Sequence, residues 1–226
     1  MLESSFSILI AGFSLGLLHA LDADHVMAVS TLSTRKPGLL NSFKHSAHWA
    51  LGHAAMLVMI GLLLFGLGVH IPETFQHLAE ASVGVLLMVM GIWCLWHFKK
   101  NPLQLKVHRH GDIVHSHLCL ADDENTDHQK SAKHAPVFIG MLHGLAGSAP
   151  ALALVPIVMQ GQLSVALVYL AVFSLGVLIS MVMFGAALGQ LQAKLQNFNI
   201  KVYQASRYLI ASASVVLGGV WLSQSL

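Results

Sequence analysis

Six long apolar runs alternate with short polar segments along the chain, and this pattern predicts a protein that crosses a membrane several times. A helix needs about 20 apolar residues to span a bilayer, and each run reaches that length. The runs cover residues 6–29, 46–69, 76–98, 136–159, 163–189 and 203–223. We therefore expect an all-α membrane protein with six transmembrane helices.

The composition supports the same class of protein. Hydrophobic residues make up 55% of the 226 positions and charged residues 10%, with a mean hydropathy of +0.69, whereas soluble proteins carry about 25% charged residues. Cys94 and Cys119 stand apart with no CxxC pair, so neither a disulfide framework nor a thiolate metal site is expected. No basic segment precedes the first run, which we therefore interpret as a span and not as a cleaved signal.

A polar segment divides the chain into three predicted regions. Residues 1–98 and 136–226 hold three spans each, and residues 99–135 form an extramembrane loop of disorder-like composition. The loop contains His108, His110, His115, His117 and His128. Histidine-rich tracts suggest weak, exchangeable metal capture, although a solvated linker would have a similar composition.

The basic residues predict the orientation of the chain. All 12 lysines and arginines lie on the first, third and fifth connections between spans. Because basic residues accumulate on the cytoplasmic side, we expect both termini outside and the histidine-rich loop in the cytoplasm. The predicted location is the cell (inner) membrane.

The two halves of the chain also share an internal repeat. Matches at an offset of 124 residues, or 128 for the last, are Leu18–Leu21 with Leu142–Leu145, Leu51–Gly52 with Leu175–Gly176, and Gly91–Trp93 with Gly219–Trp221. Since each half has an odd number of spans, the second half must enter the membrane upside down. The prediction is two inverted three-helix repeats, an arrangement common in secondary transporters with a site near the midplane.

Four ionisable residues lie inside the first apolar run: His19, Asp22, Asp24 and His25. An acid at the centre of a spanning helix costs about 2.5–3.5 kcal/mol on insertion scales, so such residues indicate a functional site. In a straight helix, His19 and His25 would be about 9 Å apart along the axis, which is too far for one ion with metal–nitrogen bonds of about 2 Å. Either the helix is unwound between Asp22 and His25, or an ion meets these ligands in succession.

Two more histidines are candidate ligands. His53 lies in the second apolar run at a depth that His25 and His143 should share, so these three could converge. His143 is the repeat partner of His19, whereas the position matching Asp24 is Ser148. The acids therefore occur in one half only, which favours a single asymmetric cation site. Nearby Trp49 is expected at the membrane interface as an anchor.

Imidazole combined with carboxylate favours a first-row divalent ion such as nickel, cobalt, zinc or iron, because calcium and magnesium prefer oxygen alone and copper(I) prefers sulfur. The ion would be transported cargo, and no permanent cofactor is expected. No Walker A sequence is present, which favours a secondary or facilitated mechanism over direct use of ATP. Expected partners are the metal ion and the lipid bilayer, and no nucleic acid.

The segment from His19 to His25 resembles the H-x4-D-H signature of the nickel/cobalt transporter superfamily, and Leu51–Ala54 resembles the glycine–histidine motif of its next span. The resemblance implies a nickel or cobalt permease with His19, Asp22, Asp24, His25 and His53 at positions associated with metal selection. Residues 143–150 look more like the short, urease-accessory-type members. Related exporters have a Glu-Pro-Gly-like centre in the first motif, so Asp22 to Asp24 favour uptake.

Other functions remain open on the sequence alone. The same fold could export metal, or the chain could assist nickel-enzyme maturation together with maturation proteins. A membrane metalloenzyme would also use histidine and aspartate ligands. Neither an HExxH pattern nor a nucleophile elbow is present, and an enzyme has no need of inverted halves, so we expect a transporter and not an enzyme.

Overall fold

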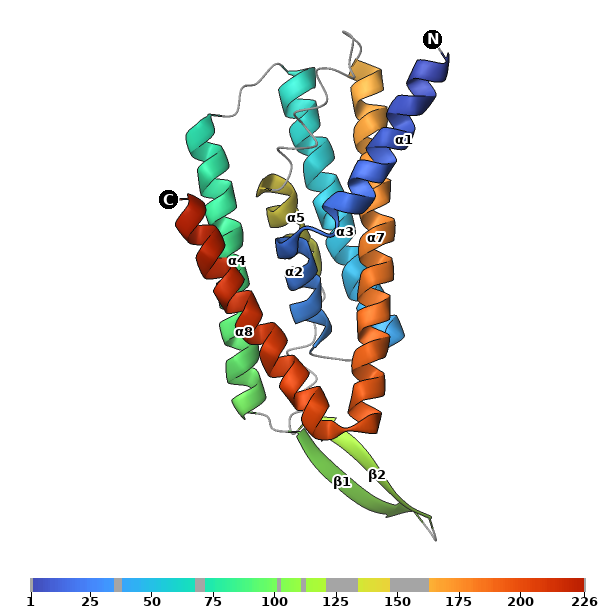
Figure 1. The fold of residues 1–226 in the computed structure, drawn as a ribbon, viewed down its shortest axis with the longest axis vertical. Coiled ribbons are helices and arrows are strands. Elements are labelled where there is room, and N and C mark those ends of the chain that lie inside the picture. The colour runs from blue at the N-terminus through green and yellow to red at the C-terminus, as the bar shows by residue number, and fades with distance from the viewer. Residues whose placement is uncertain are drawn as a thin grey trace.

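The computed structural model describes residues 2–34, 38–67, 72–100, 103–110, 113–120, 134–146 and 163–225. Figure 1 shows these residues as a helical bundle with a two-stranded hairpin at one end. The elements are α1 (Leu2–His19), α2 (Ala23–Ser33), α3 (Leu39–Gly61) with a π-helical turn η1 (Leu62–Gly66), α4 (Glu73–Lys100), β1 (Leu103–His110), β2 (Ile113–Leu120), α5 (Ala135–Ala146), α7 (Leu163–Phe198) and α8 (Ile200–Ser225).

Four helices are long and apolar enough to cross a membrane, namely α3 with its π-helical turn, α4, α7 and α8. The pair α1 and α2 makes a fifth candidate span that is bent by 56° at its break. These spans confirm a helical, multi-pass membrane protein. Of the fourth predicted span, residues 136–159, only the part within α5 belongs to the described residues.

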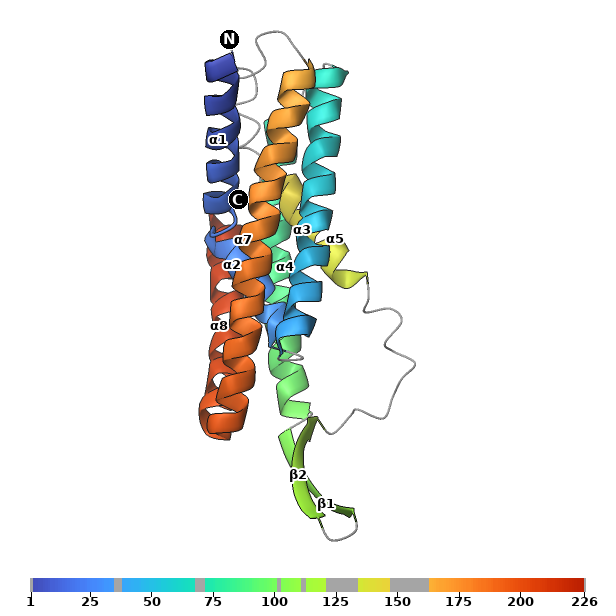
Figure 2. The ribbon, with the colours of Figure 1, turned by 90° about the vertical axis from the view of Figure 1, so that its right-hand side faces the viewer.

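The helices alternate in direction through the bundle. In Figures 1 and 2, α1, α2, α4 and α7 run from the end that holds the N-terminus toward the hairpin end, and α3, α5 and α8 run the opposite way. The main helix contacts pair the two halves of the chain: α1 with α7, α3 with α5, α3 with α7, and α4 with α8. The two halves are therefore interleaved and do not form separate bundles.

The first apolar run is broken and does not form one helix. α1 ends at His19, a tight turn follows in which the Asp22 amide donates to the His19 carbonyl (3.0 Å), and α2 begins at Ala23. Asp22 occupies the position that caps α2, where aspartate is among the preferred residues. The break therefore lies at residues 20–22, before the position that the sequence favoured, and Asp24 and His25 belong to the first turn of α2.

Glycines allow the backbones of the two halves to approach closely. A Cβ added at Gly16 on α1 would meet the carbonyl oxygen of Phe173, and one added at Gly140 on α5 would meet that of Trp49. Gly176 on α7 faces the carbonyl of Phe13 in the same way, and Gly52 on α3 faces that of Val137. Each glycine is therefore required by its neighbour's main chain, as at many helix contacts in membrane proteins.

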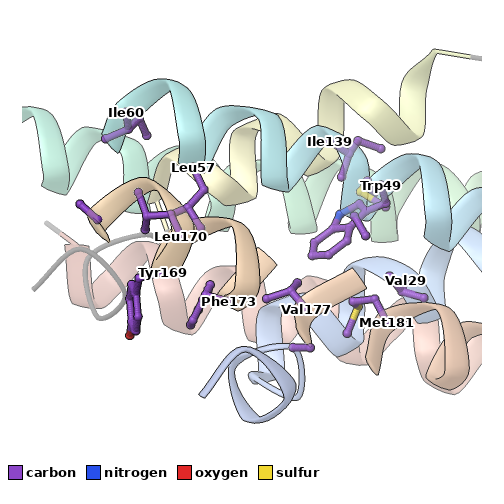
Figure 3. Close-up of a cluster of buried hydrophobic side chains, with 14 residues drawn as sticks. Val29, Trp49, Leu57, Ile60, Ile139, Tyr169, Leu170, Phe173, Val177 and Met181 are labelled. Carbon is purple, nitrogen blue, oxygen red and sulfur yellow. The ribbon is translucent and has the colours of Figure 1, made fainter. Parts of the chain in front are cut away.

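The largest group of buried apolar side chains lies between α3 and α7 (Figure 3). Leu57 of α3 lies beside Leu170 of α7, whereas Tyr169 and Phe173 point to the other side of α7. Large side chains from both halves thus close the bundle on the N-terminal side of its middle.

The hairpin formed by β1 and β2 differs from the all-α prediction. The strands pair antiparallel from Leu103 with Leu120 to His110 with Ile113. Apolar and polar residues alternate at positions 103–108, a period-2 pattern typical of a strand. The overall polarity of residues 99–135 hid this pattern, and the expected loop of disorder-like composition did not include a hairpin.

Candidate metal centre

The break between α1 and α2 brings the four ionisable residues of the first run together. His19 is the last residue of α1, and its Nδ1 lies 2.7 Å from Oδ2 of Asp22 in the turn. Asp24 and His25 start α2, where His25 Nδ1 lies 3.0 Å from Oδ1 of Asp24. Each histidine therefore has a carboxylate partner that holds its ring.

Three imidazole rings meet at one point. His25 Nε2 lies 3.3 Å from Nε2 of His53 on α3, and ligand nitrogens of His19, His25 and His53 lie within 4.8 Å of one another. His25 and His53 have no solvent exposure, and His19 is 9% exposed. This is the spacing of nitrogens that can close around one metal ion with bonds of about 2 Å.

The hydrogen bonds also fix which nitrogens are free to bind. The acceptors at Nδ1 of His19 and His25 are carboxylate oxygens, so both rings carry their proton on Nδ1 when neutral. The Nε2 atom of His25 then accepts from Nε2 of His53, whereas Nε2 of His19 presents a lone pair that has no hydrogen-bond partner within the described parts of the chain. A carboxylate that orients a ligating histidine in this way is a common feature of metal sites.

His143 lies beside this group but outside it. Its ring centroid is 5.7 Å from that of His25, and its Nδ1 donates to the carbonyl of Ile139 one turn earlier (2.9 Å). Its Nε2 therefore presents a lone pair too, and among the described residues it has no partner. His143 is thus fully buried next to the three convergent rings and prepared in the same tautomer.

A second candidate group contains both acids. Asp22, Asp24 and His25 also offer ligand atoms within 4.8 Å of one another. Asp24 is buried, whereas the side chain of Asp22 is 50% exposed. His25 therefore belongs to an outer group that includes an accessible carboxylate and to an inner group made of imidazoles.

Trp49 forms one wall of the site, and its predicted role as an interfacial anchor was wrong. It is fully buried, it stacks on His53 with ring centroids 5.5 Å apart, and its ring meets His25 edge-on at 5.1 Å. Phe173 of α7 lies 5.4 Å from the His19 ring. Trp49 and Phe173 are repeat partners at the offset of 124, a signal that could have pointed to both of them.

Comparisons with known proteins give a matching family and relatives of similar length. The family described as "Cytochrome C biogenesis protein transmembrane region" matches residues 11–220. The urease accessory protein UreH of Bacillus sp. (strain TB-90) is 30% identical over 94% of this chain and 89% of its own length. A Methanocaldococcus jannaschii protein named "Putative nickel/cobalt efflux system" is 25% identical over 94% of this chain and 90% of its own length. No solved structure matches the chain.

These relatives are transport or accessory proteins of membranes and not enzymes, and they are related to the chain over nearly its whole length. The family match covers both halves, from residue 11 within α1 to residue 220 within α8. The chain therefore belongs to the family of membrane proteins that this match describes and, with its two relatives, to the nickel/cobalt transporter family.

Proposed function

We propose that the protein moves nickel or cobalt across the membrane and that the three convergent histidines His19, His25 and His53 are its binding site. The observation that carries this proposal is the group of three buried ring nitrogens within 4.8 Å, two of them on rings held by carboxylates. Nitrogen-rich sites of this kind suit nickel, cobalt and zinc. His143 completes the site from the second half after a small shift of its ring.

The ion reaches the histidines through the acids. Asp22 is half exposed and shares a candidate ligand group with Asp24 and His25, so a hydrated dication meets carboxylate oxygens first. His25 then hands the ion to the inner group, since it belongs to both. In a straight helix His19 and His25 would be too far apart to bind one ion together. Ligands that bind the ion one after another around the break do not need to be that close.

The direction of transport is inward. Asp22 and Asp24 take the place of the Glu-Pro-Gly-like centre of related exporters. Efflux is the second candidate, because one relative is named as an efflux system. The other relative is named a urease accessory protein, and supply of nickel to an enzyme that requires it fits uptake, with maturation proteins as receivers of the ion.

The two halves form an inverted repeat of three spans each, with six spans in all. Its support is the pairing of glycines with main-chain carbonyls, which is the same at α1 with α7 and at α3 with α5 when residues are shifted by 124. Opposite helix directions in α1 and α5, and in α3 and α7, add to that support. The site then lies where the repeats meet, as in other transporters of this design.

Both termini face outward and the hairpin lies in the cytoplasm. The one-sided distribution of lysine and arginine supports this orientation. Cysteines introduced at Ser4 and Ser223 should react with an impermeant reagent in intact cells, whereas the native Cys119 should not. Labelling of Cys119 from outside would reverse the orientation.

The hairpin captures metal in the cytoplasm. Its register places His108 opposite His115, and alternate positions of a strand share a face. Positions 108, 110, 115 and 117 therefore fall on one face of the hairpin. Such an array would hold an ion exchangeably as it leaves the membrane.

The deciding experiment measures metal flux into proteoliposomes that contain the purified protein. Nickel, cobalt, zinc and magnesium are offered separately, and the initial rates are compared with those of the His25→Ala variant. We expect nickel or cobalt flux that this variant lacks. Flux that is equal for all four ions, or unchanged in the variant, would refute the proposal.

A further inference from the structure

Buried hydroxyl groups gather in one part of the bundle, between the histidines and the hairpin end. They belong to the last two turns of α2 and the first two turns of α3, and each of these residues is at most 6% exposed: Ser30, Ser33, Thr34, Ser42 and Ser46. We call Ser33, Ser42 and Ser46, with Gly185 and Gly189 of α7, the hydroxyl seam. None of them contacts the histidines in the site described above.

The seam lies where three helices meet. A Cβ at Gly185 of α7 would meet both Oγ of Ser46 on α3 and Val29 of α2 (3.2 Å). One turn further along, a Cβ at Gly189 would meet Oγ of Ser42. The amide of Gly38 donates to the carbonyl of Gly189 (3.1 Å), which holds the start of α3 against α7. The hydroxyls of Ser42 and Ser46 therefore face the bare backbone of α7.

Two hydroxyls of the seam lack the partners that a buried hydroxyl needs. Ser46 Oγ donates to the carbonyl of Ser42 (2.8 Å). In contrast, Oγ of Ser42 and Oγ of Ser33 make no hydrogen bond to any described residue, and an unsatisfied buried group costs about 1–3 kcal/mol. Alanine would pack against the glycines equally well. Close helix packing alone therefore does not explain the hydroxyls.

The opposite side of the histidine group has a different lining. Beyond His53, toward the N-terminal end of the bundle, α3 and α7 meet through Leu57, Ile60 and Leu170, each at most 3% exposed, whereas the buried hydroxyl of Tyr169 lies on the side of α7 that points away from α3 (Figure 3). A dication would lose its hydration there without replacement ligands. Among the described helices, polar groups continue from the histidines along α3 only in the direction of the hairpin.

We propose that the hydroxyl seam is the section of the transport route between the histidine site and the hairpin end, and that it carries a partly hydrated divalent cation. The proposal rests on the function proposed above. Along α3, Ser46 lies about 10 Å and Ser42 about 16 Å from His53. The hydroxyl oxygens of the seam replace water molecules without binding the ion tightly, so the ion can leave.

The test is the double variant Ser42→Ala/Ser46→Ala, together with Ser33→Ala. These changes keep the packing and remove hydroxyls, so the variants should fold at least as well as the parent protein. We expect the initial rate of nickel flux into proteoliposomes to fall about 10-fold in the double variant and less in Ser33→Ala. Equilibrium binding of nickel to the detergent-solubilised protein should stay unchanged, because the histidines are intact.

Ser214→Ala is the matched control. Ser214 is a fully buried hydroxyl on α8 that donates to the carbonyl of Leu87 on α4 (2.8 Å), away from the seam. Its removal should leave the flux unchanged. A similar loss of flux in Ser214→Ala would overturn the proposal that the hydroxyl seam is part of the transport route. A loss of nickel binding in the double variant that parallels its loss of flux would overturn it as well.

The outcome also separates the two proposals. Normal flux in the double variant, with no flux in His25→Ala, would reject the seam as the route and leave the histidine site standing. Normal flux in both variants would reject the transport site itself, and the seam with it.

Discussion

Two helix contacts in this protein, α1 with α7 and α3 with α5, are built from matching residues of the two halves. Gly16 faces the carbonyl of Phe173 at the first contact, and Gly140 faces that of Trp49 at the second. Beyond the glycines the contacts differ. After His19 the chain turns and places Asp22, Asp24 and His25 in the site, whereas α5 ends at Ala146, the residue that matches Asp22.

The sequence must allow close helix packing in both halves and must also place charge within the membrane. Close backbone packing needs glycine at both contacts, since any side chain would strike a carbonyl group. Charge near the middle of a membrane is costly, so it is present only where it has a partner and a use. These two glycine contacts are therefore alike, whereas the acids of the site belong to the first half only.

The largest expected effect on nickel transport comes from removing an acid of the site. Asp24→Asn should lower nickel transport by about 100-fold, because it weakens the hydrogen bond that orients His25, and such oriented partners are worth about 10–100-fold. The loss of a buried charge makes insertion easier, so membrane levels should be normal. Nickel accumulation in cells at matched protein levels measures the effect, and normal uptake would contradict the asymmetric site.

The scaffold should respond equally in both halves. Gly16→Ala and Gly140→Ala each place a Cβ against a backbone carbonyl, and overpacking of this kind costs about 1–3 kcal/mol. Thermal denaturation in detergent should show comparable losses of stability for the two variants. A large loss in one variant with none in the other would break the structural equivalence of the contacts.

A smaller effect is expected at the histidine that the second half contributes. His143 lies beside the three convergent rings but outside their group. His143→Ala should therefore reduce nickel transport by about 10-fold, at the lower end of the range for residues that support a metal site. A loss as deep as that of His25→Ala would instead make His143 a full ligand.

The smallest effect is expected at the repeat partner of Asp24. Ser148, outside the described residues, takes the position of that acid in the second half. Serine brings no charge into the membrane that would attract a dication, so Ser148→Ala should keep transport within about 2-fold of the parent. A transport defect as large as that of Asp24→Asn would mean that residues of both halves bind the ion.

Sequence reasoning located the candidate site but not its shape. Histidines and acids within an apolar run stand out because charge is rare there, and this signal led to His19, Asp24, His25 and His53. The position of the helix break did not follow, because the Asp22 carboxylate makes no capping bond to α2 and instead contacts His19, an interaction that sequence spacing alone does not locate. Hydropathy alone favoured the membrane interface for Trp49, whereas contacts between distant helices bury it.

For the fold as well, the sequence predicted which segments span the membrane but not their detailed shape. Apolar length identified the spans that the structure describes, since a bilayer sets that length. The bend of 56° between α1 and α2 could not be derived from it. The hairpin was missed because the average polarity of residues 99–135 masked a local alternation at 103–108.

The position of Trp49 means that its fluorescence should report the binding of the transported metal ion. Its indole lies 5.1 Å from the His25 ring and 5.5 Å from both His53 and His143, measured between centroids. Open-shell nickel and cobalt ions quench indole emission at such contact distances, whereas zinc has a filled d shell and no redox chemistry. Nickel should therefore dim one component of the emission from the four tryptophans, zinc should not, and Trp49→Phe should abolish the difference.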